Sequence, residues 1–207
     1  ELKSIDQCIK ILSNHKIIFI QPKGLNIDNK YKFIENVCFD DFFFKDIPGY
    51  NKLMLSKELY LKFKNYKYIL IFQMDAWVFR DELMDWCNKE YDYIGSPWVN
   101  KSHGRITLKT GNGGFSLRNV QAHLDTLNAF KIMQSRKDIL NKELFKSSTS
   151  WLKLFGIKNN SRYFIANFPE NEDYFWSHFA SQINPKFRVS PSEEALKFSF
   201  EKEPSLL

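Results

Sequence analysis

The sequence of 207 residues has no long apolar stretch of the kind that forms a membrane-spanning helix. Such a helix needs about 18 consecutive apolar residues, and no run approaches that length. The first segment, ELKSIDQCIK, also lacks the basic and then apolar pattern of a secretory signal peptide. It has no initiator methionine and begins almost directly with a helix-like pattern, so we expect a piece trimmed from a longer protein.

Cysteine and histidine are scarce, and neither is spaced for a metal cluster. Cys8, Cys38 and Cys87 lie far apart without a CxxC pair, which excludes a disulfide framework and a cysteine cluster. The four histidines show no HxxxH or HxH spacing, so a histidine metal site or a Ser-His triad has little support. We expect reduced, mostly buried thiols in a cytoplasmic protein.

The chain carries a formal net charge of +6, which raises the question of an anionic partner. Its lysines are scattered through several segments and form no single basic stripe or known binding module, so we expect no nucleic acid partner. A solvated basic face is the simplest interpretation. Attraction to an anionic substrate, or to a membrane surface that carries anionic lipid, suits the charge as well.

Hydrophobic residues make up 43% of the chain and include twenty phenylalanines, enough for one substantial core. We therefore expect a single domain over residues 1–207. Helix and strand patterns alternate through the first hundred residues, which favours an α/β fold with a mostly parallel sheet and helices on both faces. The predicted helices begin near Ser4, Tyr50, Asp81, Val120, Glu172 and Pro191, the main predicted strands cover 16–22, 66–79 and 91–98, and a loop is predicted for 101–109.

Local signals predict where several helices begin. Ser4 and Ser190 each begin a Ser-x-x-Gln or Ser-x-x-Glu box, and Asn119 directly precedes the helix at Val120, so we expect all three to act as caps. In open α/β sheets, ligands bind beyond the carboxyl ends of the strands. Functional residues are therefore expected just after ILIFQ, DYIGS and TGNGG.

Asp75 follows the apolar run ILIF and precedes a second apolar run, AWVF. A carboxylate between apolar segments needs a partner to offset its desolvation, and a divalent cation that carries a diphosphate is one such partner. An aspartate that caps a turn, or one that pairs with Arg80, explains the same pattern. Spacing alone does not decide between these interpretations.

A glycine-rich turn, Gly113-Gly114, follows Asn112 and precedes Phe115. Adjacent glycines permit positive φ and close approach of a ligand to the backbone, and neighbouring polar side chains could bond sugar hydroxyls. An ordinary hairpin turn is the simpler interpretation. The segment is not a P-loop, because the Lys-Ser/Thr ending is missing.

The segment PENEDYFW contains adjacent carboxylates at Glu172 and Asp173. A carboxylate beside an acceptor hydroxyl can serve as a general base. Acidic residues are also common in the first turn of a helix, where they complement its dipole. Among the large aromatic residues, Trp98 at a predicted strand end is the best candidate for a ligand contact, and His178 lies about one helical turn beyond Asp173.

Several sequence segments, taken in order, resemble a family of bacterial glycosyltransferase-like proteins grouped as DUF5672. The segments are LIFQMDAWVFRDEL with DWCNKEYDYIGSPW, then GNGGFSLRN, then PENEDYFW. The resemblance extends from about Ser4 to Glu201. It implies a GT-A-like, Rossmann-related fold and a role in surface-polysaccharide synthesis. The implied reaction transfers a sugar from a nucleotide-sugar donor, most simply a UDP-sugar, to a carbohydrate or lipid-linked glycan acceptor. The implied location is the cytoplasm, at the inner face of the cytoplasmic membrane, with peripheral membrane association.

The resemblance also implies roles for particular residues. In GT-A enzymes a DxD motif ends a central strand, and its last Asp binds the metal that bridges the donor diphosphate. Here the motif is Gln73-Met74-Asp75, which implies that Asp75 binds Mn²⁺ or Mg²⁺ and Gln73 contacts the donor. The missing first carboxylate leaves metal dependence open.

The acceptor side follows from the same resemblance. The Gly-Gly turn corresponds to the acceptor-side loop of galactosyltransferase-like members, which places Gly113, Gly114 and Phe115 near the acceptor. The Glu-Asp pair implies that Asp173 is the base of an inverting single displacement and that Glu172 binds acceptor hydroxyls.

Two departures from the GT-A pattern keep other functions open. No strand precedes Ser4, and no late metal-binding histidine follows Glu201. These absences are expected if the domain is trimmed at both ends, or if it has lost activity. The alternatives are a non-catalytic carbohydrate-binding or scaffold domain of GT-A ancestry, and then a nucleotidyltransferase, which would need a second carboxylate near Asp75.

Overall fold

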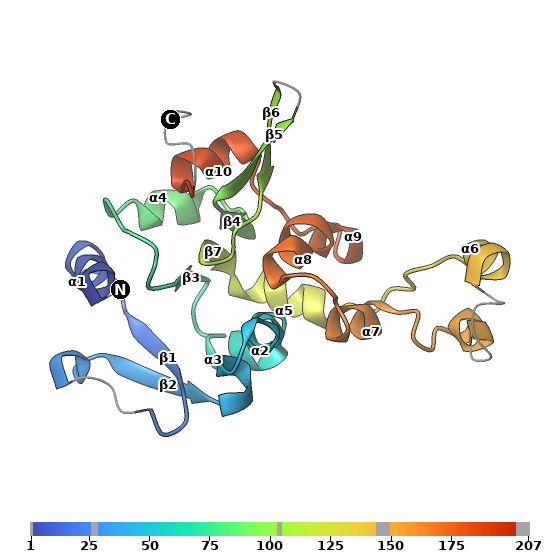
Figure 1. Ribbon diagram of the computed structural model, residues 1–207, viewed down its shortest axis with the longest axis horizontal. Coiled ribbons are helices and arrows are strands. Elements are labelled where there is room, and N and C mark those ends of the chain that lie inside the picture. The colour runs from blue at the N-terminus through green and yellow to red at the C-terminus, as the bar shows by residue number, and fades with distance from the viewer. Residues whose placement is uncertain (1, 26–28, 103–104, 144–149, 202–207) are drawn as a thin grey trace.

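The computed structural model describes residues 2–25, 29–102, 105–143 and 150–201 (Figure 1). Within these residues the strands form three small sheets, with helices packed around them. The architecture is therefore mixed α/β. The strands are β1 (Ile18–Pro22), β2 (Glu35–Phe39), β3 (Tyr68–Phe72), β4 (Tyr93–Gly95), β5 (Pro97–Ser102), β6 (Arg105–Thr110) and β7 (Phe115–Asn119).

Helices occupy most of the rest of the described chain, and many of them are short. None of the helices in these residues has the length and hydropathy needed to cross a bilayer. The α-helices are α1 (Leu2–Ile11), α2 (Ile47–Met54), α3 (Lys57–Lys62), α4 (Leu83–Asn88), α5 (Val120–Asn128), α6 (Arg136–Asp138), α7 (Ser161–Ala166), α8 (Glu172–His178), α9 (Ala180–Ile183) and α10 (Ser192–Phe198). Shorter helical turns of other types are η1 (Asn29–Tyr31), η2 (Asp41–Phe44), η3 (Ile139–Glu143) and η4 (Ser150–Phe155).

The sheet that positions the candidate site has the strand order β3-β7-β4, and both pairings are antiparallel. The side chains of its strands alternate between two hydrophobic clusters, as the pleat of a strand requires. Ile71 and Tyr93 pack into the larger cluster, whereas Ile94 and Leu117 pack into the smaller one. Because both faces are covered, the strands are apolar on both sides.

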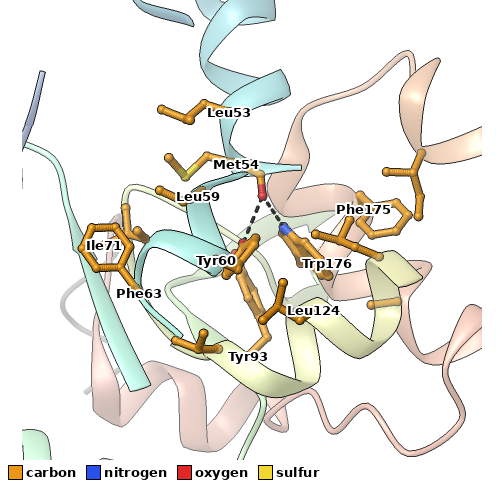
Figure 2. Packing of buried hydrophobic residues seen from close by; sticks show 14 of the residues in the cluster. Leu53, Met54, Leu59, Tyr60, Phe63, Ile71, Tyr93, Leu124, Phe175 and Trp176 are labelled. Carbon is orange, nitrogen blue, oxygen red and sulfur yellow. Dashed lines mark hydrogen bonds between the residues drawn. The ribbon is translucent and has the colours of Figure 1, made fainter. Parts of the chain in front are cut away.

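The larger cluster is formed by one face of this sheet, by strand β2, and by helices α2, α3, α5, α7, α8 and α9. At its centre lie aromatic side chains that are fully buried, among them Tyr60, Phe175 and Trp176. Tyr60 Oη and Trp176 Nε1 both donate hydrogen bonds to the carbonyl oxygen of Met54, over 3.0 and 3.3 Å (Figure 2). These two bonds join α3 and α8 to the end of α2, so the consecutive helices α2 and α3 are fixed to α8, which lies more than a hundred residues further along the chain.

The opposite face of the sheet is covered by α4 and α10. Trp86 from α4 and Ala195 from α10 pack against Ile94 and Leu117, and the ring of Phe198 lies 5.4 Å from that of Trp86. The prediction that helices cover both faces is therefore confirmed for this sheet.

The prediction of a mostly parallel sheet is wrong for the described strands. Parallel pairing occurs between β1 and β2 and at an isolated bridge between Tyr93 and Val189, while the other strand pairs are antiparallel. One physical reason is that residues 101–102 and 105–109, predicted as parts of a loop, belong to β5 and β6, which pair as a hairpin. A hairpin reverses the chain between Pro97 and Thr110, so the following strand β7 returns antiparallel to β4 and β3.

Two other predicted elements end earlier than the sequence pattern indicated. The helix predicted over 50–66 is divided into α2 and α3, because Ser56 ends one and caps the other by accepting a hydrogen bond from Leu59 N. The strand predicted over 66–79 ends at Phe72. Gln73 N then bonds Gly114 O at 2.8 Å, and a turn follows in which Ala76 N bonds Gln73 O.

The three predicted caps have different outcomes. Asn119 caps α5 as predicted, because its side chain accepts a hydrogen bond from Ala122 N at 3.1 Å. Ser4 is not a cap, because α1 begins at Leu2 and the Ser4 hydroxyl donates to Met74 O. Ser190 is not a cap either: the cap of α10 is Pro191, and no side chain completes it. Of the three thiols expected to be mostly buried, only that of Cys8 is fully buried.

Candidate active site

The centre of the candidate site is a buried ion pair between Arg118 on β7 and Glu172 in the first turn of α8. Arg118 Nη1 donates to Glu172 Oε2 at 3.0 Å, and Nη2 donates to Oε1 at 2.9 Å. The exposed fractions of the two side chains are 0% and 2%. Burial raises the pKa of the Glu172 carboxyl, and the adjacent Arg118 charge opposes that rise. A fork of two parallel bonds of this kind fixes the position of the carboxylate as well as its charge.

Arg118 uses its remaining hydrogen-bonding capacity on groups around the glycine-rich turn. Its Nε donates to Ser116 Oγ at 2.9 Å, Nη1 also donates to Tyr60 Oη at 3.1 Å, and Nη2 donates to Gly113 O at 3.3 Å. Burial raises the pKa of the Tyr60 phenol, so this hydroxyl stays protonated. The guanidinium group thus holds α3, α8 and the turn before β7 in one arrangement.

The glycine-rich turn is packed too closely to accommodate a side chain at Gly113 or Gly114. A Cβ atom added at Gly113 would overlap Glu172 Oε1, and one added at Gly114 would overlap Gln73 Oε1. Neither glycine has a positive φ, so close packing, not a left-handed conformation, explains the need for glycine here. The side chain of Asn112 closes the turn by accepting a hydrogen bond from Gly114 N at 2.9 Å.

Asp173 lies next to this turn, and its carboxylate is half-buried. Its Oδ2 accepts a hydrogen bond from Gly113 N at 3.2 Å, while Oδ1 accepts one from Tyr174 N at 2.7 Å. Glu172 directs both oxygens to Arg118 in the interior, whereas Asp173 keeps part of its carboxylate accessible to solvent. This arrangement favours a positioning role for Glu172 and leaves Asp173 as the carboxylate that a ligand can reach.

Three ring side chains extend the site along α8. The ring centroids of Trp98 and Tyr174 are 6.1 Å apart, those of Trp98 and His178 are 6.0 Å apart, and those of Tyr174 and His178 are stacked at 4.2 Å. The backbone of Gly111 packs directly against the Trp98 ring. Because Asp173, Tyr174 and His178 belong to one helix, the accessible carboxylate and the rings are neighbours.

Asp75 lies at the other end of the candidate site, in the turn after β3. It is exposed, as are its neighbours Met74 and Trp77, with exposed fractions of 49% and 48%. The argument that Asp75 needs a partner to offset desolvation is therefore wrong. Pairing with Arg80 is not observed either, because Arg80 Nε bonds Glu82 Oε1 at 3.0 Å. Helix α1 contacts the chain just after this turn, because Gln7 Nε2 donates a hydrogen bond to Val78 O at 3.0 Å.

The residues near Asp75 determine how a divalent cation would fit. In the part of the chain that the structure describes, no three His, Cys, Asp or Glu side chains converge on one point. Asp75 therefore offers a single accessible carboxylate, while the Gln73 side chain lies against Gly114. Mg²⁺ is commonly held by one or two carboxylates together with substrate phosphates and water. The ligating groups near Asp75 are therefore compatible with a cation that binds together with a diphosphate. They fit a permanently bound cation less well.

Phe115, predicted to lie near the acceptor, packs on the other face of the sheet. Its ring lies 5.3 Å from Phe198 and 6.4 Å from Phe72. Strand alternation explains this position, because Ser116 and Arg118 of β7 face the candidate site while Phe115 and Leu117 face away from it. The structure brings together Gln73, Asn112, Gly113, Gly114, Glu172, Asp173 and Trp98, with Asp75 two residues beyond Gln73 and Phe115 turned away.

Several residues that build the site were not singled out from the sequence. Arg118 and Tyr60 form the ion-pair network, and Asn51 accepts a hydrogen bond from Glu172 N at 3.2 Å at the start of α8. The Tyr50 hydroxyl is buried beside this network, and burial raises its pKa. One sequence signal was available: an arginine in the otherwise strand-like run FSLRN is costly to bury without an acidic partner.

Together, the fold and the site define a mixed α/β protein in which a buried ion pair supports a glycine turn beside an accessible carboxylate. The chain matches the family described as "Protein of unknown function (DUF5672)" over residues 33–207. It belongs to that family. The match begins after β1, later than the extent expected from Ser4 to Glu201, and continues to the last residue. No curated protein and no solved structure gives a significant match.

Proposed function

We propose that this chain is a GT-A-like glycosyltransferase domain that moves a sugar from a nucleotide-sugar donor to a carbohydrate acceptor. One observation carries the proposal: three segments far apart in sequence meet within hydrogen-bonding distance. Gln73 follows β3, Gly113 and Gly114 precede β7, and Asp173 begins α8, with bonds of 2.8 Å from Gln73 N to Gly114 O and 3.2 Å from Gly113 N to Asp173 Oδ2. A donor contact, an acceptor loop and a base are the parts that such a transfer needs.

Asp173 has the role of general base in this proposal. The acceptor hydroxyl oxygen attacks the anomeric carbon of the donor sugar, and its proton passes to the Asp173 carboxylate. The bond between the anomeric carbon and the diphosphate oxygen breaks on the opposite side, and the nucleoside diphosphate leaves. This single displacement inverts the configuration at the anomeric carbon. Glu172, held by Arg118, fixes the start of α8 and therefore the position of Asp173.

The acceptor side of the site consists of the glycine turn and the neighbouring rings. Trp98 and Tyr174 offer apolar faces on which a sugar ring can stack, and Asn112 and the turn backbone offer polar groups for its hydroxyls. The acceptor is in this view a carbohydrate, free or linked to a lipid. A role in bacterial surface-polysaccharide synthesis at the inner face of the cytoplasmic membrane is part of the same proposal.

The donor side consists of Gln73 and the exposed turn at Asp75. Trp77, half-exposed in this turn, can stack on the base of a nucleotide such as a UDP-sugar. Asp75 would hold Mn²⁺ or Mg²⁺ together with the diphosphate, and that cation supplies neutralisation of the charge on the leaving group. The exposure of the turn supports a ligand of this kind, since no described protein group covers it.

A second function, carbohydrate binding without catalysis, is favoured by a separate observation. Trp98, Tyr174 and His178 form a ring cluster that can hold a sugar whether or not Asp75 binds a cation. This function needs neither a donor nor a base. Titration with nucleotide sugars separates the two, because a binding module without transfer activity shows no cation-dependent affinity for the donor.

The Asp173→Asn variant tests the proposed transfer. A panel of UDP-, GDP- and dTDP-sugars identifies a donor by calorimetry with and without Mn²⁺, and turnover is followed as release of the nucleoside diphosphate. We expect Asp173→Asn to lower turnover about 100-fold or more while donor affinity is retained, because a general base contributes roughly 10² to 10⁴. Asp125→Asn, an exposed substitution on α5, is the control. Unchanged turnover would remove Asp173 from the role, and cation-independent binding of sugars alone would favour the second function.

A further inference from the structure

Residues 130–143 leave the body of the protein after α5, residues 150–160 return to it at α7, and we call these two stretches together the arm. In Figure 1 the arm extends to the right, with α6 far from the three sheets. Within these stretches, η3 packs against α6 and against η4. The arm is therefore a projection that contacts the core near its root, where Met133 packs against the larger cluster.

The root of the arm is closed by hydrogen bonds of buried side chains. Asn159 Oδ1 accepts from Gln134 N at 2.8 Å, and its Nδ2 donates to Gln134 O at 3.1 Å. Ser161, which is fully buried, donates to Ala129 O at 2.7 Å and accepts from Lys131 N at 3.0 Å. These bonds hold the two ends of the arm together and fix its direction of departure.

The arm exposes several large apolar side chains. Phe155 has an exposed fraction of 74%, and the ring of Trp151, 51% exposed, lies 6.1 Å from it. Scattered apolar residues on a surface need no explanation, but a group of them on one projection marks a contact site. The exposed apolar residues of the arm are Phe130, Ile132, Leu140, Trp151, Phe155 and Ile157.

Basic residues accompany these apolar side chains. Arg136, Lys137 and Lys158 are exposed. Acidic residues are fewer along the segment, so its charge is positive. Among the arm residues whose side chains are described, the basic ones are Lys131, Arg136, Lys137, Lys153 and Lys158, and the acidic one is Asp138.

We propose that the arm is a membrane-contact surface whose partner is a bilayer that contains anionic lipid. Tryptophan and phenylalanine insert at the boundary between lipid headgroups and acyl chains, and lysine and arginine bind the anionic headgroups. Each basic residue near such a surface adds to the attraction. Aliphatic side chains such as Ile132 and Leu140 fit a bilayer better than nucleic acid, which would be bound through phosphate contacts and ring stacking.

Vesicle co-sedimentation tests this surface without reference to any enzymatic activity. The probes are phosphatidylcholine vesicles with and without about 30% phosphatidylglycerol, at physiological and at high salt. We expect the wild-type chain to sediment with the anionic vesicles and much less with neutral ones, and high salt to weaken binding, because it screens the basic residues.

Two double variants report on the two parts of the surface. Trp151→Ser with Phe155→Ser removes the apolar contacts, and Lys137→Glu with Lys158→Glu reverses two charges. We expect each to lower the apparent vesicle affinity by about tenfold or more. Phe33→Ser with Ile47→Ser is the matched control, because those side chains are 73% and 69% exposed but lie outside the arm; it should sediment like the wild type.

Three results would overturn the proposal. The first is sedimentation of both double variants at the wild-type level. The second is equal binding of the wild type to neutral and anionic vesicles. The third is concentration-dependent dimerisation in light scattering, lost in the Trp151/Phe155 variant, without vesicle binding; the arm would then contact a second copy of the chain. The charge variant keeps the proposal testable if the apolar variant does not fold.

Discussion

The two ends of the candidate site differ in how the chain holds them. Arg118 is fully buried and all three of its guanidinium nitrogens donate hydrogen bonds, whereas Asp75 lies in an exposed turn. The buried end needs a single arrangement, because an unpaired charge there is costly. The exposed end can change its side chains at little cost to the fold. We therefore expect substitutions at the two ends of the candidate site to change the stability of the fold by different amounts.

Replacement of Arg118 should have the largest effect on stability. Arg118→Met leaves the Glu172 carboxylate buried without its partner, so we expect the free energy of unfolding to fall by about 3–5 kcal/mol. Urea denaturation measures the loss. The double variant Arg118→Met with Glu172→Leu removes both charges and should recover much of the stability. If Arg118→Met unfolded at the wild-type urea concentration, the buried end would not be the more constrained one.

A methyl group at Gly113 tests the packing of the same end. Gly113→Ala would place Cβ against Glu172 Oε1 and Arg118 Nη2, so we expect a loss of about 1–3 kcal/mol by overpacking. Gly24→Ala is a useful comparison, because nothing lies within 4 Å of its added Cβ and its cost comes from a φ of +82° alone. A Gly113→Ala variant as stable as the wild type would mean that the turn can shift.

The pH dependence of stability tests the aromatic surroundings of the buried end. His123 is fully buried, stacks at 4.7 Å on Tyr60, and has its pKa lowered well below the ordinary value by burial and then by the Arg118 charge. The unfolded chain binds this proton near pH 6.5, but the folded chain does not. The stability that depends on neutral His123 is therefore complete above about pH 6.5 and is lost as the pH falls below it.

His123→Phe should remove this part of the pH dependence. Between about pH 6.5 and 5 we expect the wild type to lose stability more steeply than the variant, by up to about 1.4 kcal/mol per pH unit. Urea denaturation at several pH values gives the slopes. His15→Gln, at a histidine outside the core, serves as the control. Equal slopes for wild type and His123→Phe would show that the histidine is protonated without cost.

The smallest effect on stability is expected at the exposed end. Asp75→Ala should change the free energy of unfolding by no more than about 0.5 kcal/mol, because the side chain is exposed. Under the proposed function the same variant should lose cation-dependent affinity for the nucleotide sugar in calorimetry. Asp85→Ala, exposed on α4, should keep that affinity. Retained cation-dependent binding in Asp75→Ala would disconnect this turn from the donor.

Some local signals in the sequence were confirmed by the structure, although two of the three predicted caps were wrong. Asn119 capped α5 as expected, and the acidic pair of PENEDYFW lay in the first turn of α8. Such features depend on interactions between residues a few positions apart, which a sequence displays directly. The mixed α/β class also followed from the alternation of patterns.

The features that were missed depend on contacts between distant residues. The partner of Arg118 lies more than fifty residues away at Glu172, and no local pattern specifies that pairing. The hairpin of β5 and β6 was missed because its polar residues resemble a loop, and this error also led to the wrong prediction of parallel strands. Phe115 was placed on the acceptor side because its neighbours are there, although strand alternation turns its ring to the opposite face.

The closed root of the arm has a consequence for the changes in length that the chain can tolerate. Ile132 and Asn160 form an antiparallel bridge, so the chain leaves and returns at points that a short turn could also join. Insertions and deletions between these points leave the bonds of Ser161 with Ala129 and Lys131 unchanged. The arm is therefore a part of this chain whose length can change without altering the ion pair of Arg118 and Glu172.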